Sequence, residues 1–408
     1  MTVNRLAFIA LWLLVFSMPW ERSVAIPGIG AAGTLFGLIA FALGVYTVVA
    51  GGKIKARVPS LFLILFAFYV VWVGLSFFWG INPGGAQIRA TTFAQFLVMA
   101  WLIWELCRTQ KRHIALLQAY ICGAYVVIVS IVYNFLANPF VATRERDLFR
   151  YTGIDDNPNF VATAVAIGIS IAWYLAMRHQ RGLAHWFNLA YLPLSVMALG
   201  LIASRSGMLI GVVSLGIIPL TYSYLSTRRK VVLTLLISAV SLGAFSLIPE
   251  SNIERLSTTG EELATGNVSN RDFIWQAGFK AFQGSPLIGV GAGSYSDAVE
   301  AARGFGYPSH NAYIAVLAEL GILGLLLFFA VLIVPLLPLL KLPLRERALY
   351  IVLWLGILVA FMPNNWETHK TPWFLLTLFT TQRAYVILPN NLPKRRERPR
   401  AQLHYERG

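Results

Sequence analysis

Charged side chains are rare in this sequence, and two arginines and a histidine lie within or at the ends of its polar segments. Arg205 lies in the turn 203–206, Arg271 lies in the polar segment 250–310, and His310 ends that segment. Arginine binds phosphate oxygens in pairs through its planar guanidinium group. Histidine, with an ordinary pKa of about 6.5, can take a proton from a hydroxyl near neutral pH. These residue types predict a site for an anionic substrate that reacts with a hydroxyl group.

The charged residues also have plainer interpretations. His310 precedes a long apolar run and fits an interfacial or helix-capping residue. Arg271 fits a solvated loop charge or an ion pair with Glu261 or Glu262. A nearby phosphate would favour the charged form of His310, so its roles as a base and as a cation compete. The sequence leaves these alternatives open.

Helix ends strengthen the prediction of an anion site. Helices that begin near Pro158, Gly207 and Asn311 would present their N-termini on the same side of a membrane. Free N–H groups and the positive end of the helix dipole attract anions there. Asn157 can cap the first of these helices. Arginines gather on the same side, which makes Arg150 a candidate binding residue as well; they are Arg144, Arg146, Arg150, Arg205 and Arg271.

Two further motifs favour structural roles. The run Gly289–Gly293 is superficially similar to a phosphate-binding turn, but it lacks the strand and helix of a dinucleotide-binding unit. We interpret its glycines as tight turns that fold the polar segment onto the helices. Glu319 lies within an apolar helix, nine residues after His310, and helical geometry puts the two on opposite faces. We therefore expect Glu319 to be a buried structural residue.

Composition places these residues in a membrane protein. Hydrophobic residues make up 57% of the 408 residues, charged residues make up 12%, and the mean hydropathy is +0.65. Soluble domains carry about 25% charged residues. Apolar runs of roughly 18–25 residues match a helix that crosses about 30 Å of hydrocarbon, and they lack the alternation of a membrane β-barrel. The sequence predicts an all-α polytopic membrane protein.

About 12 transmembrane helices are predicted, together with one large periplasmic loop that contains short helices. Residues 1–249 would hold the first nine spans, 250–310 the loop, 311–389 the last three spans, and 390–408 a basic cytoplasmic tail. The helices are expected at 6–20, 29–50, 58–79, 88–107, 114–137, 158–177, 186–203, 207–225, 230–249, 311–340, 347–363 and 371–389.

Charge sets the predicted orientation. Most of the 33 lysine and arginine residues lie in short segments on one side of this arrangement, which marks the cytoplasm. Both termini are therefore expected inside, and the run 6–20 reads as a first span without a cleavage site. We interpret the basic run 394–400 as an anchor beside anionic lipids, so nucleic acid is not an expected partner. Cys107 and Cys122 indicate neither a disulfide framework nor a metal site.

The chain resembles the bacterial O-antigen ligase and polymerase superfamily, most clearly across residues 200–325. The resemblance rests on an ordered set of motifs within one arrangement, where a single large loop precedes the last helices. The motifs are Ser204-Arg205-Ser206-Gly207, Arg271 with Trp275, Pro286-Leu287-Ile288-Gly289-Val290-Gly291, His310-Asn311 and Glu319-Leu320-Gly321-Ile322 followed by Leu325, with Asn157-Pro158-Asn159 as a weaker element.

This resemblance implies a membrane glycosyltransferase of the bacterial inner membrane whose active site faces the periplasm. It implies transfer of a glycan from undecaprenyl diphosphate to an acceptor hydroxyl, with inversion at the anomeric carbon. In the ligases that hydroxyl belongs to a lipid A–core sugar. It also implies that Arg205 and Arg271 hold the diphosphate and that His310 acts at the reacting centre. Further candidate substrate-binding residues are Asn157, Asn311, Arg150 and Trp275.

An O-antigen ligase of lipopolysaccharide biosynthesis is the leading hypothesis, and no cofactor or metal is expected. Asp155 and Asp156 leave a metal site as a minor alternative. An O-antigen or exopolysaccharide polymerase, or a ligase with a protein acceptor, would use the same motifs. A transporter of lipid-linked glycans is the alternative from a different class. Transporters are typified by internal repeats, broken helices and charges at the midplane, whereas arginines at one surface favour an enzyme.

The last outer segment, residues 364–370, is a weaker candidate for acceptor binding. Glu367 and His369 offer polar groups there, and Trp366 could stack on a sugar. A solvated loop with an interfacial tryptophan is the plainer interpretation.

Overall fold

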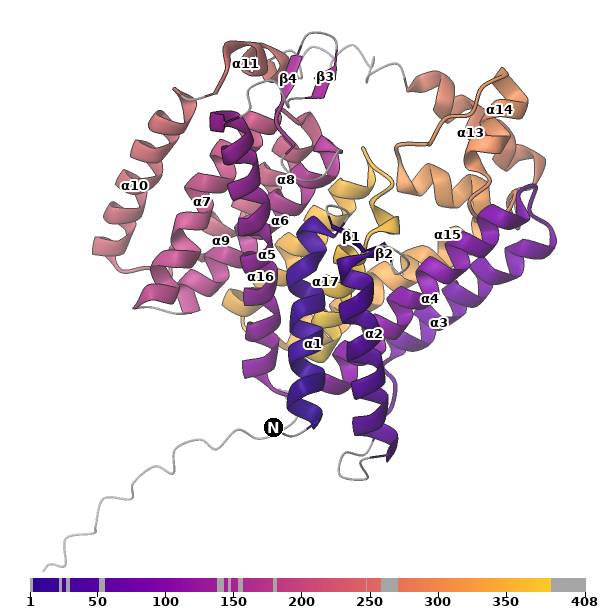
Figure 1. The fold of residues 1–408 in the computed structure, drawn as a ribbon, viewed down its shortest axis with the longest axis horizontal. Coiled ribbons are helices and arrows are strands. Elements are labelled where there is room, and N and C mark those ends of the chain that lie inside the picture. The colour runs from indigo at the N-terminus through magenta and orange to yellow at the C-terminus, as the bar shows by residue number, and fades with distance from the viewer. Residues whose placement is uncertain are drawn as a thin grey trace, which may run out of the picture.

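The structure is a computed structural model that describes residues 3–21, 24–26, 30–50, 56–137, 143–145, 148–152, 157–178, 182–246, 248–257 and 271–382. Most of these residues are helical (Figure 1). The α-helices are α1 (Val3–Ser17), α2 (Ala32–Val45), α3 (Leu61–Leu75), α4 (Pro83–Leu106), α5 (Gln110–Ala137), α6 (Pro158–Arg178), α7 (Leu183–Ile202), α8 (Arg205–Leu215), α9 (Ile217–Tyr222), α10 (Thr227–Phe245), α11 (Glu250–Ser257), α13 (Asp272–Gly284), α14 (Tyr295–Arg303), α15 (Ala312–Ile333), α16 (Leu344–Phe361) and α17 (Lys370–Thr381).

Shorter elements extend or join these helices. Two antiparallel strand pairs occur in the described part of the chain, β1 (Ala25–Ile26) with β2 (Gly30–Ala31) and β3 (Thr143–Glu145) with β4 (Leu148–Arg150). The short helical turns are η1 (Met18–Trp20), η2 (Tyr46–Ala50), η3 (Ser76–Phe78), η4 (Val334–Lys341) and η5 (Trp366–Thr368).

Nine helices in the described residues are long and apolar enough to cross a membrane. Helices α10, α16 and α17 also form where spans are predicted, but α10 and α16 each begin with charged residues and α17 has only 12 residues. The fold is thus a polytopic α-helical membrane protein, while the count of twelve spans remains a prediction. The predicted continuation of the last helix to 389 and the tail 390–408 lie outside the described residues.

The outer faces of the helices carry large apolar side chains. Phe68 of α3 is 60% exposed and Ile88 of α4 is 69% exposed. A soluble protein rarely exposes a large contiguous apolar surface, whereas lipid tails solvate one. The interior differs, since it packs aromatic rings such as those of Phe66 and Trp373, stacked with centroids 4.5 Å apart. Helix α17, buried along its whole length, forms the centre of this interior.

Helix α4 begins at Pro83, five residues before the predicted start of 88. Asn82 caps it by accepting a hydrogen bond from the Gly85 N–H at 2.8 Å, and proline is well suited to the first helical position. The apolar pattern alone missed this polar first turn. Arg89, inside both the predicted and the observed helix, is an ionisable residue in a membrane-spanning segment and calls for a functional explanation.

Helix α15 is broken at Gly321, where φ is 65° and ψ is −169°. Backbone groups of the polar segment before α15 form hydrogen bonds with the backbone groups that the break leaves without helical partners. Gly291 donates its N–H to the Glu319 carbonyl at 2.8 Å, and Ile322 donates to the Pro286 carbonyl at 2.9 Å. Broken membrane helices are tolerated only where protein groups satisfy the freed backbone in this way. The apolar run gave no sign of this break.

The glycine run therefore has the structural role expected for it. Gly289, Gly291 and Gly293 all have positive φ, which glycine alone adopts without strain. A Cβ atom at Gly289 would overlap the backbone of Glu319. The neighbouring Ala292 donates its N–H to the Ser76 hydroxyl at 3.0 Å, so the run also binds the turn between α3 and α4.

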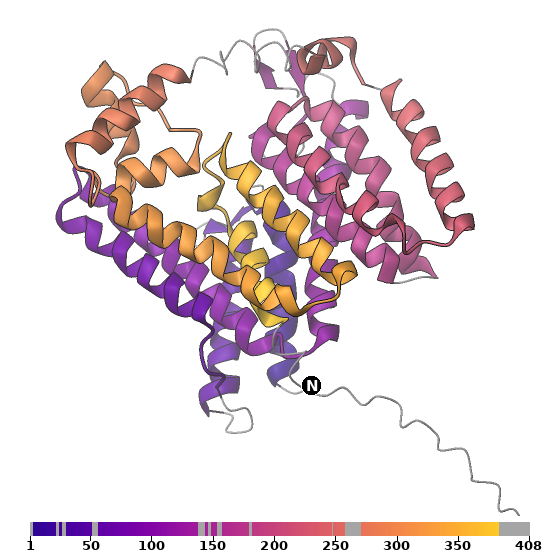
Figure 2. The ribbon, with the colours of Figure 1, turned by 180° about the vertical axis from the view of Figure 1, so that it is seen from behind.

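Helices α13 and α14 pack on the first half of α15 and on each other (Figure 2). Ile274 and Gly278 of α13 are buried against this unit, and the Tyr295 hydroxyl of α14 donates to the Ile274 carbonyl at 2.9 Å. Helices α14 and α15 therefore cover this face of α13.

The basic residues predicted on one side of the membrane gather at one end of the bundle. Arg57 donates to the Trp104 carbonyl at the end of α4, and Arg112 donates to Asn4 at the start of α1. Arg178, at the end of α6, lies 3.8 Å from Glu346 at the start of α16. The N-termini of α6 and α17 and the C-terminus of α16 consequently lie at the opposite end.

Candidate functional site

Arg271 and His310 meet at this opposite end. Arg271 immediately precedes α13, and its Nη1 donates to the carbonyl oxygens of His310 at 3.5 Å and of Pro363 at 2.9 Å. Trp275, one turn later in α13, donates its indole N–H to the Ser309 carbonyl at 2.9 Å. Arg271 at the N-cap of α13 and Trp275 within it thus hold the backbone carbonyls of His310 and Ser309.

The turn at His310 is fixed from both sides. Ser309 accepts a hydrogen bond from the Asn311 N–H at 3.2 Å, and its hydroxyl lies 2.9 Å from the Asn311 carbonyl. Asn311 caps α15, because its side-chain oxygen accepts from the N–H groups of Tyr313 and Ile314 at 3.0 and 3.1 Å. Asn311 is therefore a capping residue in this structure. His310 projects from a braced loop at a helix N-terminus.

His310 has a φ of 48°, an uncommon conformation for a residue with a side chain. Ala203, two residues before Arg205, has a φ of 50°, and these are the only non-glycine residues with positive φ in the described chain. Such strain persists where the surroundings impose it, and it clusters at functional sites. One strained residue, His310, is itself a predicted site residue, and the other, Ala203, lies two residues before the predicted site residue Arg205.

Burial, assisted by the positive charge of Arg271, lowers the pKa of His310 from its ordinary 6.5 to about 4. The imidazole is therefore neutral at neutral pH and can accept a proton. Of the two competing roles, this favours a base over a cation. Burial also lowers the pKa of Arg271, although arginine remains protonated at any physiological pH.

Arg205 is the first residue of α8, in a second cluster at the same end. Ser204 caps α8 by accepting from the Gly207 N–H at 3.2 Å, and its hydroxyl donates to the Asn159 side-chain oxygen at 2.8 Å. Asn157 accepts from the Asn159 N–H at 3.0 Å and so caps α6, as its position before Pro158 predicts. The motifs around Asn157 and Arg205, far apart in sequence, are neighbours in space.

Arg150 ends β4, and the next residue, Tyr151, donates its N–H to the Leu201 carbonyl near the end of α7 at 3.3 Å. The backbone at Arg150 is thus close to the turn that carries Arg205. Arg146, Asp155 and Asp156 lie outside the described residues, so their predicted roles remain predictions.

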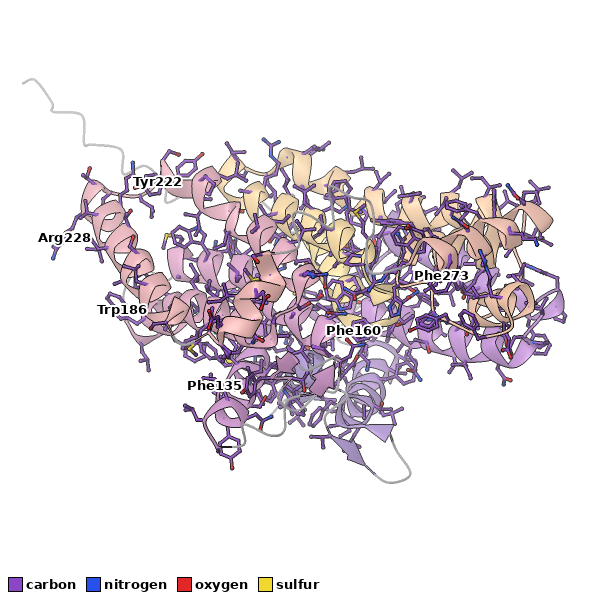
Figure 3. The ribbon with its side chains drawn as sticks, turned by 90° about the horizontal axis from the view of Figure 1, so that it is seen from above. Phe135, Phe160, Trp186, Tyr222, Arg228 and Phe273 are labelled. Atoms are coloured by element: carbon purple, nitrogen blue, oxygen red, sulfur yellow. The ribbon has the colours of Figure 1, made fainter. Side chains whose placement is uncertain are left out.

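The segment 362–370 connects the two clusters, which the sequence did not suggest. Its first part accepts the hydrogen bond of Arg271 at Pro363, and in its last part the His369 ring packs at a tilt against Phe160 of α6, with centroids 4.2 Å apart. Seen from above, Phe160 lies between the side of the molecule marked by Trp186 and the side marked by Phe273 (Figure 3). The segment therefore occupies the middle of this end.

From Asn364 onward this segment is buried or partly buried rather than solvated. Trp366 is 1% exposed and packs edge-on against Phe361, so it is not available to stack on a sugar. Lys370 pairs with Glu21, which follows η1 after α1. The plainer interpretation of a solvated loop was wrong, and so was the suggestion of sugar stacking by Trp366. The segment had only three candidate residues to draw attention to it, and its contacts with Arg271, Phe160 and Glu21 join residues far apart in sequence.

Two buried carboxyl groups complete the site. Glu319 of α15 accepts the Tyr295 N–H at 3.2 Å, which identifies the partner of this structural residue. Glu367 of η5 is 3% exposed, and burial raises its pKa to about 7, although the charge of Arg89 opposes the shift. Sequence reasoning missed Arg89, whose charge acts on both carboxyl groups. Its position inside the predicted span 88–107 was the signal that could have found it.

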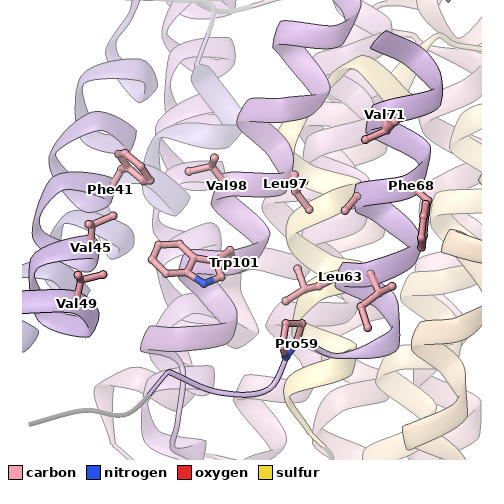
Figure 4. Close-up of a pocket in the computed structure, with 12 residues that line it drawn as sticks. Phe41, Val45, Val49, Pro59, Leu63, Phe68, Val71, Leu97, Val98 and Trp101 are labelled. Carbon is pink, nitrogen blue, oxygen red and sulfur yellow. The ribbon is translucent and has the colours of Figure 1, made fainter. Parts of the chain in front are cut away.

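An apolar groove of about 720 Å³ lies between α2, α3 and α4 (Figure 4). Phe41, Leu63 and Trp101 contribute to its lining, and none of the predicted site residues does. A groove of this composition on a membrane-embedded surface is filled by lipid tails, and we assign it no part in the site.

The fold and these two clusters define a polytopic membrane protein with an arginine- and histidine-bearing site at one end of its helices. Residues 189–329 match the family model described as O-antigen ligase. The match confirms the resemblance of this region to the O-antigen ligase superfamily, whose members are membrane glycosyltransferase-like enzymes acting on lipid-linked glycans. It includes Arg205, Arg271 and His310 but not Asn157, Arg150 or the segment 362–370. No curated protein matches the chain.

Proposed function

We propose that this protein is an O-antigen ligase. It transfers a polysaccharide from undecaprenyl diphosphate to a hydroxyl of a lipid A–core sugar, on the periplasmic side of the bacterial inner membrane. The observation that carries this proposal is the contact between Arg271 and the backbone of His310, because it joins an anion-binding cation and a neutral base in one site. The family match across residues 189–329 supplies the class of substrate.

The proposed reaction breaks the bond between the anomeric carbon and the diphosphate. The diphosphate leaves with growing negative charge, and a preorganised guanidinium stabilises such charge as it develops. Arg271 is held in place by two carbonyl oxygens, and Arg205 starts α8, whose N-terminal N–H groups add to its charge. The two arginines are thus assigned to the diphosphate, and we propose that no metal takes part.

His310 acts on the acceptor in this mechanism. Its neutral imidazole takes the proton of the attacking hydroxyl, and the hydroxyl oxygen forms the new bond to the anomeric carbon as the diphosphate leaves. Attack from the face opposite the diphosphate inverts the configuration at that carbon. Asn311 and Trp275 support the step indirectly, since both hold the backbone beside His310.

A glycan profile of cells that lack this protein tests the assignment. Long glycan chains stranded on the undecaprenyl carrier, together with bare lipid A–core, are the expected result for a ligase. Single repeat units would instead identify a polymerase of the same superfamily. An unchanged profile would refute both and return attention to transport, a function for which the break in α15 is a favourable feature.

A further inference from the structure

Glu367 is a buried carboxyl group that the proposed reaction does not use. One of its oxygens, Oε2, has no hydrogen-bond partner among the described residues. The other, Oε1, accepts a long hydrogen bond of 3.4 Å from the Asn365 side chain. A buried charge without partners is costly, so burial favours the protonated carboxyl and raises its pKa to about 7.

The same amide group of Asn365 also holds the turn at His310. Its Nδ2 donates to the Ser309 hydroxyl oxygen at 2.8 Å. Ser309 in turn brackets His310 by its contacts with the N–H and carbonyl of Asn311. One NH₂ group therefore divides its hydrogen bonds between Glu367 and the residue that braces the strained turn.

We propose that Glu367 is a positioning residue that holds or releases the His310 turn through Asn365 and Ser309, according to whether its carboxyl is protonated. A neutral carboxyl binds the Asn365 amide weakly and leaves the 2.8 Å bond to Ser309 intact. An ionised carboxylate accepts hydrogen bonds roughly twice as strongly. It draws the amide away from Ser309, and the turn with its unfavourable φ relaxes.

The charges around Glu367 allow this ionisation near neutral pH. Arg89 of α4 favours the carboxylate, while Glu319 of α15 opposes it. Tyr69 of α3 faces the same carboxyl. Lys370, the nearest cation in sequence, is already paired with Glu21. His369 lies 4.0 Å from Glu21, on the far side of that pair.

The consequence for catalysis rests on the proposed transfer activity and gives it a pH dependence. Transfer by the full-length protein in liposomes is measured from pH 6 to pH 8 with a lipid-linked glycan donor and lipid A–core acceptor. A group that titrates near pH 7 goes from about 90% to about 10% protonated over this range, so wild-type transfer should fall about tenfold. Glu367→Gln should keep its rate across the range, because glutamine never carries the charge.

Glu346→Gln is the matched control. Glu346 begins α16 at the other end of the bundle and pairs with Arg178. This variant should follow the wild-type pH profile. If the transfer rate of Glu367→Gln fell between pH 6 and pH 8 as much as that of the wild type, the proposal would be overturned.

A second measurement needs no substrate. Hydrogen exchange in the peptide 309–315 should be slower in Glu367→Gln than in the wild type at pH 8 and equal at pH 6. Equal exchange at both pH values would also overturn the proposal. If Glu367→Gln does not accumulate, Asn365→Ala replaces it, and exchange there should be fast at pH 6 as well as at pH 8. An Asn365→Ala exchange rate equal to the slow wild-type rate at pH 6 would count against the link.

The transfer assay and the exchange measurement distinguish a failure of the proposed function from a failure of the proposed role of Glu367. A wild-type protein that transfers no glycan at any pH refutes the proposed function, while the exchange comparison still tests Glu367. A wild-type protein that transfers glycan with no loss between pH 6 and pH 8 supports the function and refutes the role of Glu367.

Discussion

Replacing Arg271 tests whether this residue serves the reaction or only the fold. In the structure its Nη1 donates to the Pro363 carbonyl at 2.9 Å and more weakly to the His310 carbonyl at 3.5 Å. Arg271→Ala removes both bonds and the charge. Arg271→Lys keeps the charge, but an ammonium group lacks the planar fork that serves two acceptors while facing a phosphate.

Two losses are expected for Arg271→Ala, one in the stability of the fold and one in the rate of transfer. A hydrogen bond to a charged group contributes about 1.5–3 kcal/mol to the stability of the fold. The bond to Pro363, at 2.9 Å, is the shorter of the two, so its loss should lower the free energy of unfolding by about 2 kcal/mol. Loss of a preorganised donor at the reacting charge adds about 3–4 kcal/mol to the barrier. Transfer by Arg271→Ala should therefore fall at least about 100-fold, and transfer by Arg271→Lys about tenfold.

The assay is the initial rate of glycan transfer in liposomes, normalised to folded protein by size-exclusion chromatography. Arg303→Ala is the control, since Arg303 lies in the same segment, is exposed, and contacts only Gln276 at 3.5 Å among the bonds described for it. It should transfer at the wild-type rate. If Arg271→Lys matched the wild type, or if Arg303→Ala lost as much as Arg271→Ala, the assigned role of Arg271 would be wrong.

Three further predictions follow from the same contacts. Because the pKa of His310 is lowered to about 4, the unfolded chain takes up its proton first as the pH falls, so stability present above about pH 6.5 is lost between 6.5 and 4. The melting temperature of the wild type should therefore drop further between pH 7 and pH 4.5 than that of His310→Gln, and equal drops would contradict the assignment. Ser204→Ala removes the cap of α8 and should lower the free energy of unfolding by about 1 kcal/mol in a denaturation experiment; Ser246→Ala, at an exposed hydroxyl, should not. Gly289→Ala should prevent accumulation in the membrane fraction, as judged by immunoblot, because a Cβ there overlaps the backbone of Glu319 at positive φ, whereas Gly284→Ala meets open space and should accumulate normally.

The helices could be predicted from the sequence because apolar runs report on lipid exposure directly. Apolar runs do not, however, report where a helix breaks or where its polar first turn begins. The run after Asn311 is apolar apart from Glu319, so nothing local marks the break at Gly321, which depends on hydrogen bonds to the Pro286 carbonyl and from the Gly291 N–H. Helix α4 shows the converse case, since its first turn is polar and only the Asn82–Pro83 pair signals its start.

The site could be predicted only in part, for a related reason. Residue type and order pointed to Arg205, Arg271 and His310, and capping rules placed Asn157 at the start of α6. The partners of Arg271 are backbone carbonyls, which every residue carries, so no sequence pattern identifies Pro363 as one of them.

The segment 362–370 lies between the two clusters of the candidate site. No contact between Arg205 and the Arg271–His310 pair is described, and the two clusters belong to different groups of helices. The segment contacts both, through Pro363 on one side and through His369 against Phe160 on the other. Helix α16, which leads into it, packs on α6 and α8. In the proposed reaction, a donor held by both arginines would span this segment. Glu367 lies within that segment, so its ionisation acts where the two halves of the site are joined.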